Sequence, residues 1–147
     1  MRGRRLAFDY GDARIGVAVC DPDGILSSPL PYIENRKSSV MKEISAIIAE
    51  YDPIEIFLGL PLHLSGSSSA TIEKIEVFAQ QLKDEFSVRI IFVDERLSTV
   101  GAQKQLKEAG VSMKDSKSLI DSMAAVSILE QGLLIQSHVK DSDAPAE

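Results

Sequence analysis

The segment RRLAFDYGDARIGVAVC, residues 4–20, holds two apolar runs rich in β-forming residues, and the polar tripeptide GDA joins them. Two such runs with a tight connection predict a β-hairpin. One residue breaks the apolar pattern, because Asp9 lies near the end of the first run. A carboxylate inside such a run is costly to bury unless something pairs with it. A functional role for Asp9 is therefore the first hypothesis.

The residues that follow extend the hairpin into a meander. The segment DPDG, residues 21–24, has proline and glycine at positions typical of a turn. A third strand is predicted over residues 25–33, short or at a sheet edge, because Pro29 and Pro31 cannot donate to a β-ladder. Three consecutive strands with tight turns predict an antiparallel meander.

From residue 40 the apolar spacing changes from that of a strand to that of a helix. Pro53 ends a first helix with an apolar stripe of Val40, Ile44, Ile47 and Ile48. A short buried strand is predicted over residues 54–60. The helix after it has an apolar face formed by Ile72, Ile75, Ala79, Leu82 and Phe86.

The second half of the chain continues this alternation. A strand is predicted over residues 88–95, and its apolar IIFV core indicates cover on both faces. A weaker helix over residues 98–110 ends at Gly110, which is a plausible C-cap. A final helix, from about Lys117 to Ile135, is rich in apolar residues.

The predicted order, β-β-β-α-β-α-β-α-α, indicates an α/β fold. Strand–helix–strand units favour parallel strands with right-handed crossovers. Added to one side of the meander, they make a mixed five-stranded sheet flanked by helices, with the first strand at its centre. A chain of 147 residues can bury roughly 70% of its unfolded surface, so one domain is expected over residues 1–136. The polar residues 137–147 are predicted to be a disordered tail.

Composition limits the class of protein. The net charge of −6 argues against broad, non-specific binding of nucleic acid. It does not exclude a nuclease, because metal sites need local acidity. The single cysteine, Cys20, suits a reducing compartment, and no apolar run approaches the roughly 20 residues of a membrane span. A cytoplasmic protein that makes no contact with a membrane is expected.

Three acidic positions interrupt the apolar pattern, and the predicted topology brings them together. Asp9 ends the first strand, Glu95 ends the last strand, and Asp121 lies in the most apolar helix. Open α/β sheets bind ligands at the carboxyl ends of their strands, and Ala124 and Ala125 allow the helix to approach the sheet closely. Three converging carboxylates repel one another unless a cation binds, and oxygen ligands suit Mg²⁺ or Mn²⁺. The three acids are therefore predicted to hold metal for two-metal phosphodiester hydrolysis.

Each acid also has a structural interpretation. Asp9 and Gly11 could form a turn closed by an Asx hydrogen bond. Glu95 could pair with Arg96. Asp121 could be an N-terminal helix residue favoured by the helix dipole. All three interpretations would have to hold together to replace the metal site, so the metal-binding hypothesis is preferred.

Four motifs, LAFDYGDARIGVAV, GLPLHLSGS, VDERLST and IDSMAAVSILE, resemble in order and spacing those of the YqgF family of bacterial RNase H-like proteins. The resemblance runs from about Leu6 to Leu134. Members of this family are described as nucleases of pre-16S rRNA and, in some cases, as Holliday junction resolvases. The resemblance implies an RNase H-like fold and a catalytic Asp-Glu-Asp set, which falls on Asp9, Glu95 and Asp121.

Five further motif residues are candidates for binding substrate phosphates. Gly11 lacks a Cβ and allows close approach of the backbone, or it only serves hairpin geometry. Arg14 and Arg96 could clamp phosphate oxygens, or pair with nearby aspartates. Gly66 and Ser67 lie in the loop SGSSSAT, whose N–H groups could hold a phosphate or belong to a capped helix start.

The function expected from these observations is metal-dependent endonucleolytic processing of the 5′ end of pre-16S rRNA in ribosome biogenesis, with structured RNA as partner. An alternative is a Holliday junction resolvase acting on branched DNA, which would favour a homodimer because two symmetric strands are cut. A non-catalytic nucleic-acid-binding module is a third hypothesis. An ATP-binding protein of the actin or sugar-kinase type is a fourth, but such proteins need two lobes and 147 residues supply one.

Overall fold

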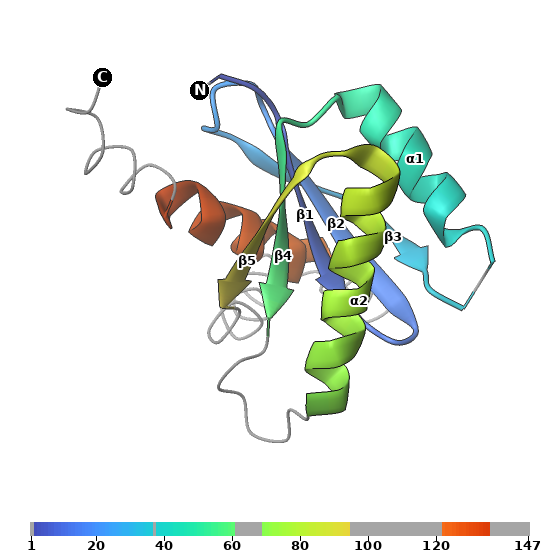
Figure 1. Ribbon diagram of the computed structural model, residues 1–147. Helices are drawn as coiled ribbons and strands as arrows, with labels where there is room; N and C mark the ends of the chain where they lie inside the picture. Colours follow the sequence, from blue (N-terminus) through green and yellow to red (C-terminus); the bar gives the residue numbers. More distant parts are fainter. Residues whose placement is uncertain (1, 37, 61–68, 95–121, 136–147) are drawn as a thin grey trace, which may run out of the picture.

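A computed structural model of the chain describes residues 2–36, 38–60, 69–94 and 122–135 (Figure 1). Its centre is a five-stranded sheet in the order β3-β2-β1-β4-β5. The first strand of the chain is thus central, as predicted. The predicted mixed sheet flanked by helices is confirmed.

The first three strands form the antiparallel meander. They are β1 (Arg5–Tyr10), β2 (Arg14–Cys20) and β3 (Ser27–Glu34). The predicted turn between β2 and β3 forms because the Gly24 N–H donates to the carbonyl oxygen of Asp21 at 3.0 Å and Gly24 adopts a φ of +70°. The strand that contains the two prolines lies at a sheet edge, as expected.

The remaining strands run parallel to β1. Strand β4 (Glu55–Leu60) pairs with β1, and β5 (Arg89–Asp94) pairs with β4. Helix α1 (Val40–Tyr51) connects β3 to β4, and α2 (Ser69–Phe86) precedes β5. The carboxyl ends of β1, β4 and β5 therefore meet at one edge of the sheet, which is the lower edge in Figure 1. We call it the carboxyl edge.

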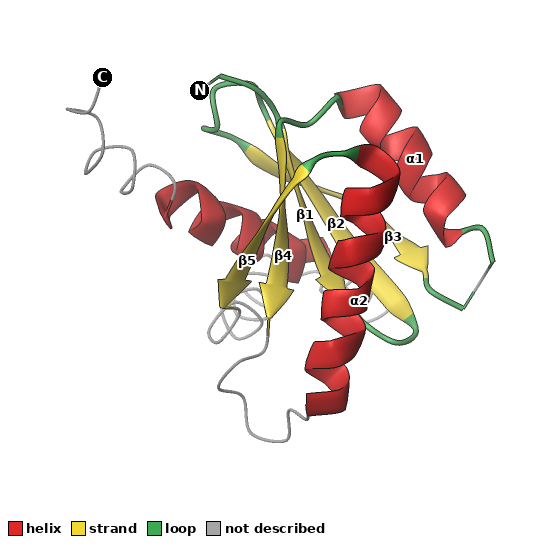
Figure 2. Ribbon diagram, viewed as in Figure 1, coloured by secondary structure: helices red, strands yellow, loops and turns green. Residues whose placement is uncertain are grey.

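Each face of the sheet has its own apolar core. Helices α1 and α2 cover one face, and a helix over residues 122–135 covers the other (Figure 2). The core under α1 and α2 includes Leu6, Phe8, Ile44, Phe78 and Leu82. The core under the helix over 122–135 includes Ala7, Phe57, Val93, Ala125 and Leu129. Alternate residues of β1 enter opposite cores, as the alternation of side chains along a strand requires.

Small residues bring the helix over 122–135 close to the sheet. Ala124 and Ala125 are buried, as the sequence predicted. Gly132 approaches even closer, because a Cβ at that position would lie 2.6–2.7 Å from carbons of the Phe57 ring.

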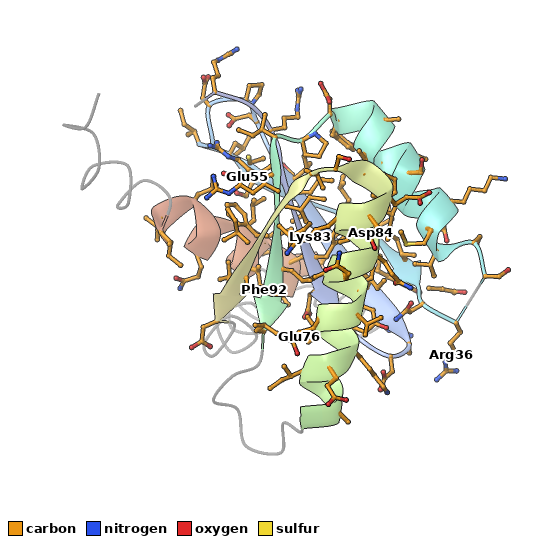
Figure 3. All side chains as sticks on the ribbon, viewed as in Figure 1. Arg36, Glu55, Glu76, Lys83, Asp84 and Phe92 are labelled. Atoms are coloured by element: carbon orange, nitrogen blue, oxygen red, sulfur yellow. The ribbon has the colours of Figure 1, made fainter. Side chains whose placement is uncertain are left out.

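The predicted cover on both faces of the last strand is only partial. Val93 is buried, whereas Phe92 on the opposite face is 38% exposed (Figure 3). The physical reason is the position of β5 at the end of the strand order, where the described part of the chain supplies a neighbouring strand on one side only.

A buried ion pair lies at the amino ends of β1 and β4, opposite the carboxyl edge. The Arg5 Nε donates to Glu55 Oε1 at 3.0 Å, and both side chains are less than a tenth exposed. Figure 3 shows Glu55 toward the end of β4 that lies away from the carboxyl edge. The thiol of Cys20 lies nearby and accepts the Arg5 backbone N–H at 3.3 Å. Burial raises the pKa of the Cys20 thiol, so Cys20 is a core residue rather than a reactive one.

Some sequence predictions fall outside the described residues. These are the helix over 98–110, the first turn of the final helix before residue 122, and the tail over 137–147. Within the described residues, no helix is both long and apolar enough to span a bilayer.

Candidate functional site

Asp9 lies close to the carboxyl end of the central strand. It is half-buried, and the alternation along β1 places it on the same face as Ala7, which is the face that the helix over 122–135 covers. Tyr10 points the other way and contacts the Phe78 ring with a centroid distance of 4.8 Å. Asp9 thus lies one residue before the end of β1, at the carboxyl edge, between residues whose side chains are anchored in the two cores.

Two glycines flank Asp9 on the neighbouring strands. Gly16 of β2 is the direct register partner of Asp9. Gly59 of β4 follows Leu58, the partner of Phe8, and alternation places it on the same face as Phe57. Neither neighbour supplies a side chain to this face. The positions directly beside Asp9 on the two neighbouring strands are therefore both glycines.

The turn after β1 is held in a defined position. A Cβ on Gly11 would lie 2.7 Å from the Arg14 carbonyl oxygen, so the turn requires glycine there. Asn35, the residue after β3, donates from its Nδ2 to the Gly11 carbonyl oxygen at 2.7 Å. Its backbone N–H also donates to the Ala13 carbonyl oxygen at 2.9 Å. Sequence analysis missed Asn35, since an asparagine after a strand is also typical of an ordinary turn.

The predicted phosphate ligand Arg14 lies directly after this turn. Its guanidinium carbon lies 5.0 Å from the centroid of the Tyr32 ring, within the range of a cation–π contact. Asp12, at the tip of the turn, forms an exposed ion pair with Lys74 of α2 at 3.1 Å. Arg14 thus begins β2 at the carboxyl edge, two residues before Gly16, the register partner of Asp9.

The other predicted site residues lie outside the described residues: Glu95, Asp121, Gly66, Ser67 and Arg96. Two of their sequence neighbours are described. Asp94, which precedes Glu95, ends β5 and is the register partner of Leu60. Ser122, which follows Asp121, is buried and donates from its Oγ to the carbonyl oxygen of Leu30 on β3.

The described residues alone do not make up a metal centre. Within them, no group of three or more His, Cys, Asp or Glu side chains could hold an ion. Asp9 is the one predicted ligand in this set. Its carboxylate is an oxygen donor of the kind that Mg²⁺ and Mn²⁺ accept, and its glycine neighbours leave room beside it. Asp9 is therefore compatible with a metal site that further ligands would complete.

The sequence of the chain is similar to that of proteins named as nucleases. A family model described as "RuvX: Holliday junction resolvase" matches residues 3–134. The chain is 44% identical to a "Putative pre-16S rRNA nuclease" of Streptomyces avermitilis over 148 residues, which cover 99% of this chain and 94% of that protein. A protein of the same name from Streptomyces coelicolor is 46% identical over 134 residues, which cover 90% and 80% of the two chains.

Comparison of structures finds the same fold in proteins of distant sequence. Thermus thermophilus RuvC matches with a TM-score of 0.57 at 10% identity, covering 92% of this chain and 96% of that one. The same protein in complex with a Holliday junction substrate matches with a TM-score of 0.58 at 12% identity, covering 91% and 96%. At these identities the likeness concerns the fold, and the expected RNase H-like architecture is confirmed.

Proposed function

The chain belongs to the RuvX/YqgF family, and from this membership we propose that it is a metal-dependent endonuclease that processes the 5′ end of pre-16S rRNA. The observation that carries the proposal is the position of Asp9. It stands at the carboxyl end of the central strand, between two glycines, at the edge where open α/β sheets bind ligands.

The proposed metal ligands are Asp9, Glu95 and Asp121. Two described neighbours support this assignment. Asp94 ends β5 at the carboxyl edge. Ser122, which follows Asp121, donates a hydrogen bond to Leu30 of β3. Leu30 pairs with Val17 of β2, and Val17 pairs with Phe8 of β1. Ser122 is therefore attached to the sheet in line with Phe8, the residue before Asp9.

The bound ions, Mg²⁺ or Mn²⁺, would supply a water nucleophile active at neutral pH and charge stabilisation for the leaving oxygen. The protein's own contribution is to place carboxylate oxygens on rigid elements, with their backbone fixed by the sheet. Arg14 has a fixed position after the turn, and we propose that it binds a substrate phosphate. Gly11, Gly66, Ser67 and Arg96 are proposed to contribute further phosphate contacts.

We prefer the RNA substrate because two relatives at 44–46% identity, matched over most of their length, each carry the name "Putative pre-16S rRNA nuclease". A second candidate function, resolution of Holliday junctions, is favoured by the description of the matching family model. That function would require a homodimer, since two symmetric strands must be cut. The rRNA function places the protein in the cytoplasm.

Cleavage of two substrates side by side tests the proposal. The purified protein is incubated with 5′-extended 16S rRNA and with a four-way DNA junction, in Mg²⁺, Mn²⁺ or Ca²⁺. We expect cleavage of the RNA in Mg²⁺ or Mn²⁺ and poor cleavage in Ca²⁺, because the longer and looser coordination of Ca²⁺ misplaces the attacking water.

The matched variants are Asp9→Asn and Asp84→Asn, the latter changing an exposed carboxylate on α2 (Figure 3). Asp9→Asn should abolish cleavage and Asp84→Asn should retain it. Cleavage of the junction alone would select the resolvase function. Binding of RNA without cleavage under any metal would indicate a non-catalytic module, and full activity of Asp9→Asn would contradict the proposed site.

A further inference from the structure

We propose that Asn35 is a positioning residue for the site. It holds the turn Gly11–Ala13, which separates the two functional residues Asp9 and Arg14. The inference rests on the proposed function, since it assigns Asn35 a role through Asp9 and Arg14 rather than through contact with substrate.

Asn35 binds both ends of the turn. Its side-chain Nδ2 donates to the Gly11 carbonyl oxygen at 2.7 Å, and its backbone N–H donates to the Ala13 carbonyl oxygen at 2.9 Å. The β1–β2 ladder has its last register pair at Tyr10 and Ile15, just before the turn. Asn35, which follows β3, therefore holds the turn by hydrogen bonds where the β1–β2 ladder no longer does.

The end of the turn is also held by β3, because Arg14 pairs in register with Glu34. The ion pair between Lys74 and Asp12 also reaches it, but the two side chains are 56% and 79% exposed. Water screens such a pair and its two flexible side chains must be ordered, so its contribution is small. Asn35 is half-buried, and the carbonyl it satisfies would otherwise need water or another donor. The asparagine side chain is thus the stronger of the two contacts.

Precise placement of this turn matters for the chemistry because a displacement of about 1 Å at a reacting group can cost on the order of 100-fold in rate. Asp9 lies two residues before Gly11, and Arg14 directly follows Ala13. Loss of the side-chain bond at Gly11 leaves the Asn35 backbone bond to Ala13 and the β1–β2 ladder in place, so we expect a small shift of the turn rather than its release. Loss of Asn35 should consequently affect the rate of the chemical step and the metal affinity rather than the overall affinity for nucleic acid.

The experiment compares three variants. Asn35→Asp keeps the shape of the side chain but removes its N–H donors, and Asn35→Ala removes the contact without adding charge. Lys74→Ala removes only the exposed contact to the same turn and is the matched control. In steady-state cleavage, kcat should fall about tenfold in both Asn35 variants with KM within about twofold of wild type, and Lys74→Ala should retain both constants.

A second measurement does not depend on cleavage. Mn²⁺ broadens NMR signals near its site, so titration of the Asp9 and Tyr10 amide signals reports metal affinity at Asp9. Both Asn35 variants should need several-fold more Mn²⁺ for the same broadening. Wild-type kcat and wild-type Mn²⁺ affinity in both variants would overturn the role of Asn35. A wild-type protein that neither cleaves nor binds Mn²⁺ near Asp9 would overturn the proposed function, and the role of Asn35 with it.

Discussion

Asp21 shows how a single carboxylate couples this fold to pH. Its Oδ1 accepts the Ile25 backbone N–H at 2.8 Å, and this bond, with further backbone N–H groups, holds the pKa of Asp21 below its ordinary value. A lowered native pKa means that the charged form stabilises the fold above the unfolded pKa, and that this contribution is lost as the pH falls through the native pKa.

The Asp21→Asn variant tests this coupling. Asparagine keeps an acceptor for the Ile25 N–H but removes the charge, so the variant should be less stable than wild type at pH 7. The difference should begin to shrink as the pH falls below about 4, near the unfolded pKa of an aspartate, and disappear only below the lower native pKa, where the folded wild-type carboxylate is protonated too. Urea unfolding across this pH range measures it, with Asp84→Asn as the control for loss of a surface charge. A difference that persists at low pH would contradict the assignment.

The candidate site was predictable from sequence only where a signal was local. Asp9 was identifiable because one carboxylate interrupts an apolar run, and Gly11 because it belongs to the same short motif. Asn35 was not identifiable, since its side-chain contact to Gly11 spans 24 residues and no periodicity announces it. The metal-binding role of Asp9, Glu95 and Asp121 stays a prediction, and the last two also lie outside the described residues.

Among the elements, the helix over 122–135 has the tightest contact with the sheet. The Phe57 ring is fully buried, and a Cβ on Gly132 would lie 2.6–2.7 Å from its carbons. Gly132→Ala should therefore destabilise the protein, although alanine normally favours a helix by about 1 kcal/mol over glycine. Overpacking of a core costs about 1–3 kcal/mol, so we expect a net loss of about 1 kcal/mol in the free energy of unfolding.

Thermal and urea unfolding measure this loss. The neighbouring exposed change Gln131→Ala should have little effect and serves as the control. Adding Phe57→Leu to Gly132→Ala should recover part of the loss relative to the sum of the single changes, because the smaller side chain makes room for the methyl group. A Gly132→Ala variant more stable than wild type would show that the ring moves aside at no cost.

The order and type of the described helices and strands could be predicted from apolar periodicity. The spacing of Val40 to Ile48 matches α1, and the alternation in residues 4–20 matches β1 and β2. The exposure of Phe92 on β5 could not be predicted from the sequence, because its burial depends on what lies beside the strand. A run of apolar letters cannot distinguish the last strand of a sheet from an inner one.

At the scale of the whole molecule, the Arg5–Glu55 pair joins the meander to the parallel half of the sheet. Arg5 is on β1 and Glu55 is its register partner on β4. Glu55→Gln leaves the Arg5 charge buried without its counter-ion, which typically costs about 3–5 kcal/mol. For a domain of this size we expect the melting temperature to fall by roughly 10 °C.

Two further variants test whether the fall in melting temperature comes from the unpaired buried charge. The double change Arg5→Met with Glu55→Leu should be much less destabilised than Glu55→Gln, because no unpaired charge is buried. The exposed pair Arg2–Asp23, whose atoms lie 2.7 Å apart, is the control, and Asp23→Asn should leave the melting temperature unchanged. Equal effects of Glu55→Gln and Asp23→Asn would contradict the structural role of the buried pair.

The two prolines of the edge strand also affect the order of events during synthesis. Strands β1 to β3 end at Glu34, so they can pair locally before β4 begins at Glu55. The ribosome adds about 5–20 residues per second, so this interval lasts roughly one to four seconds. Throughout it, Pro29 and Pro31 make β3 a poor template for a foreign strand, because they lack N–H donors. The free side of β1 has no such protection, so the nascent chain is most vulnerable to aggregation at β1 until β4 pairs with it.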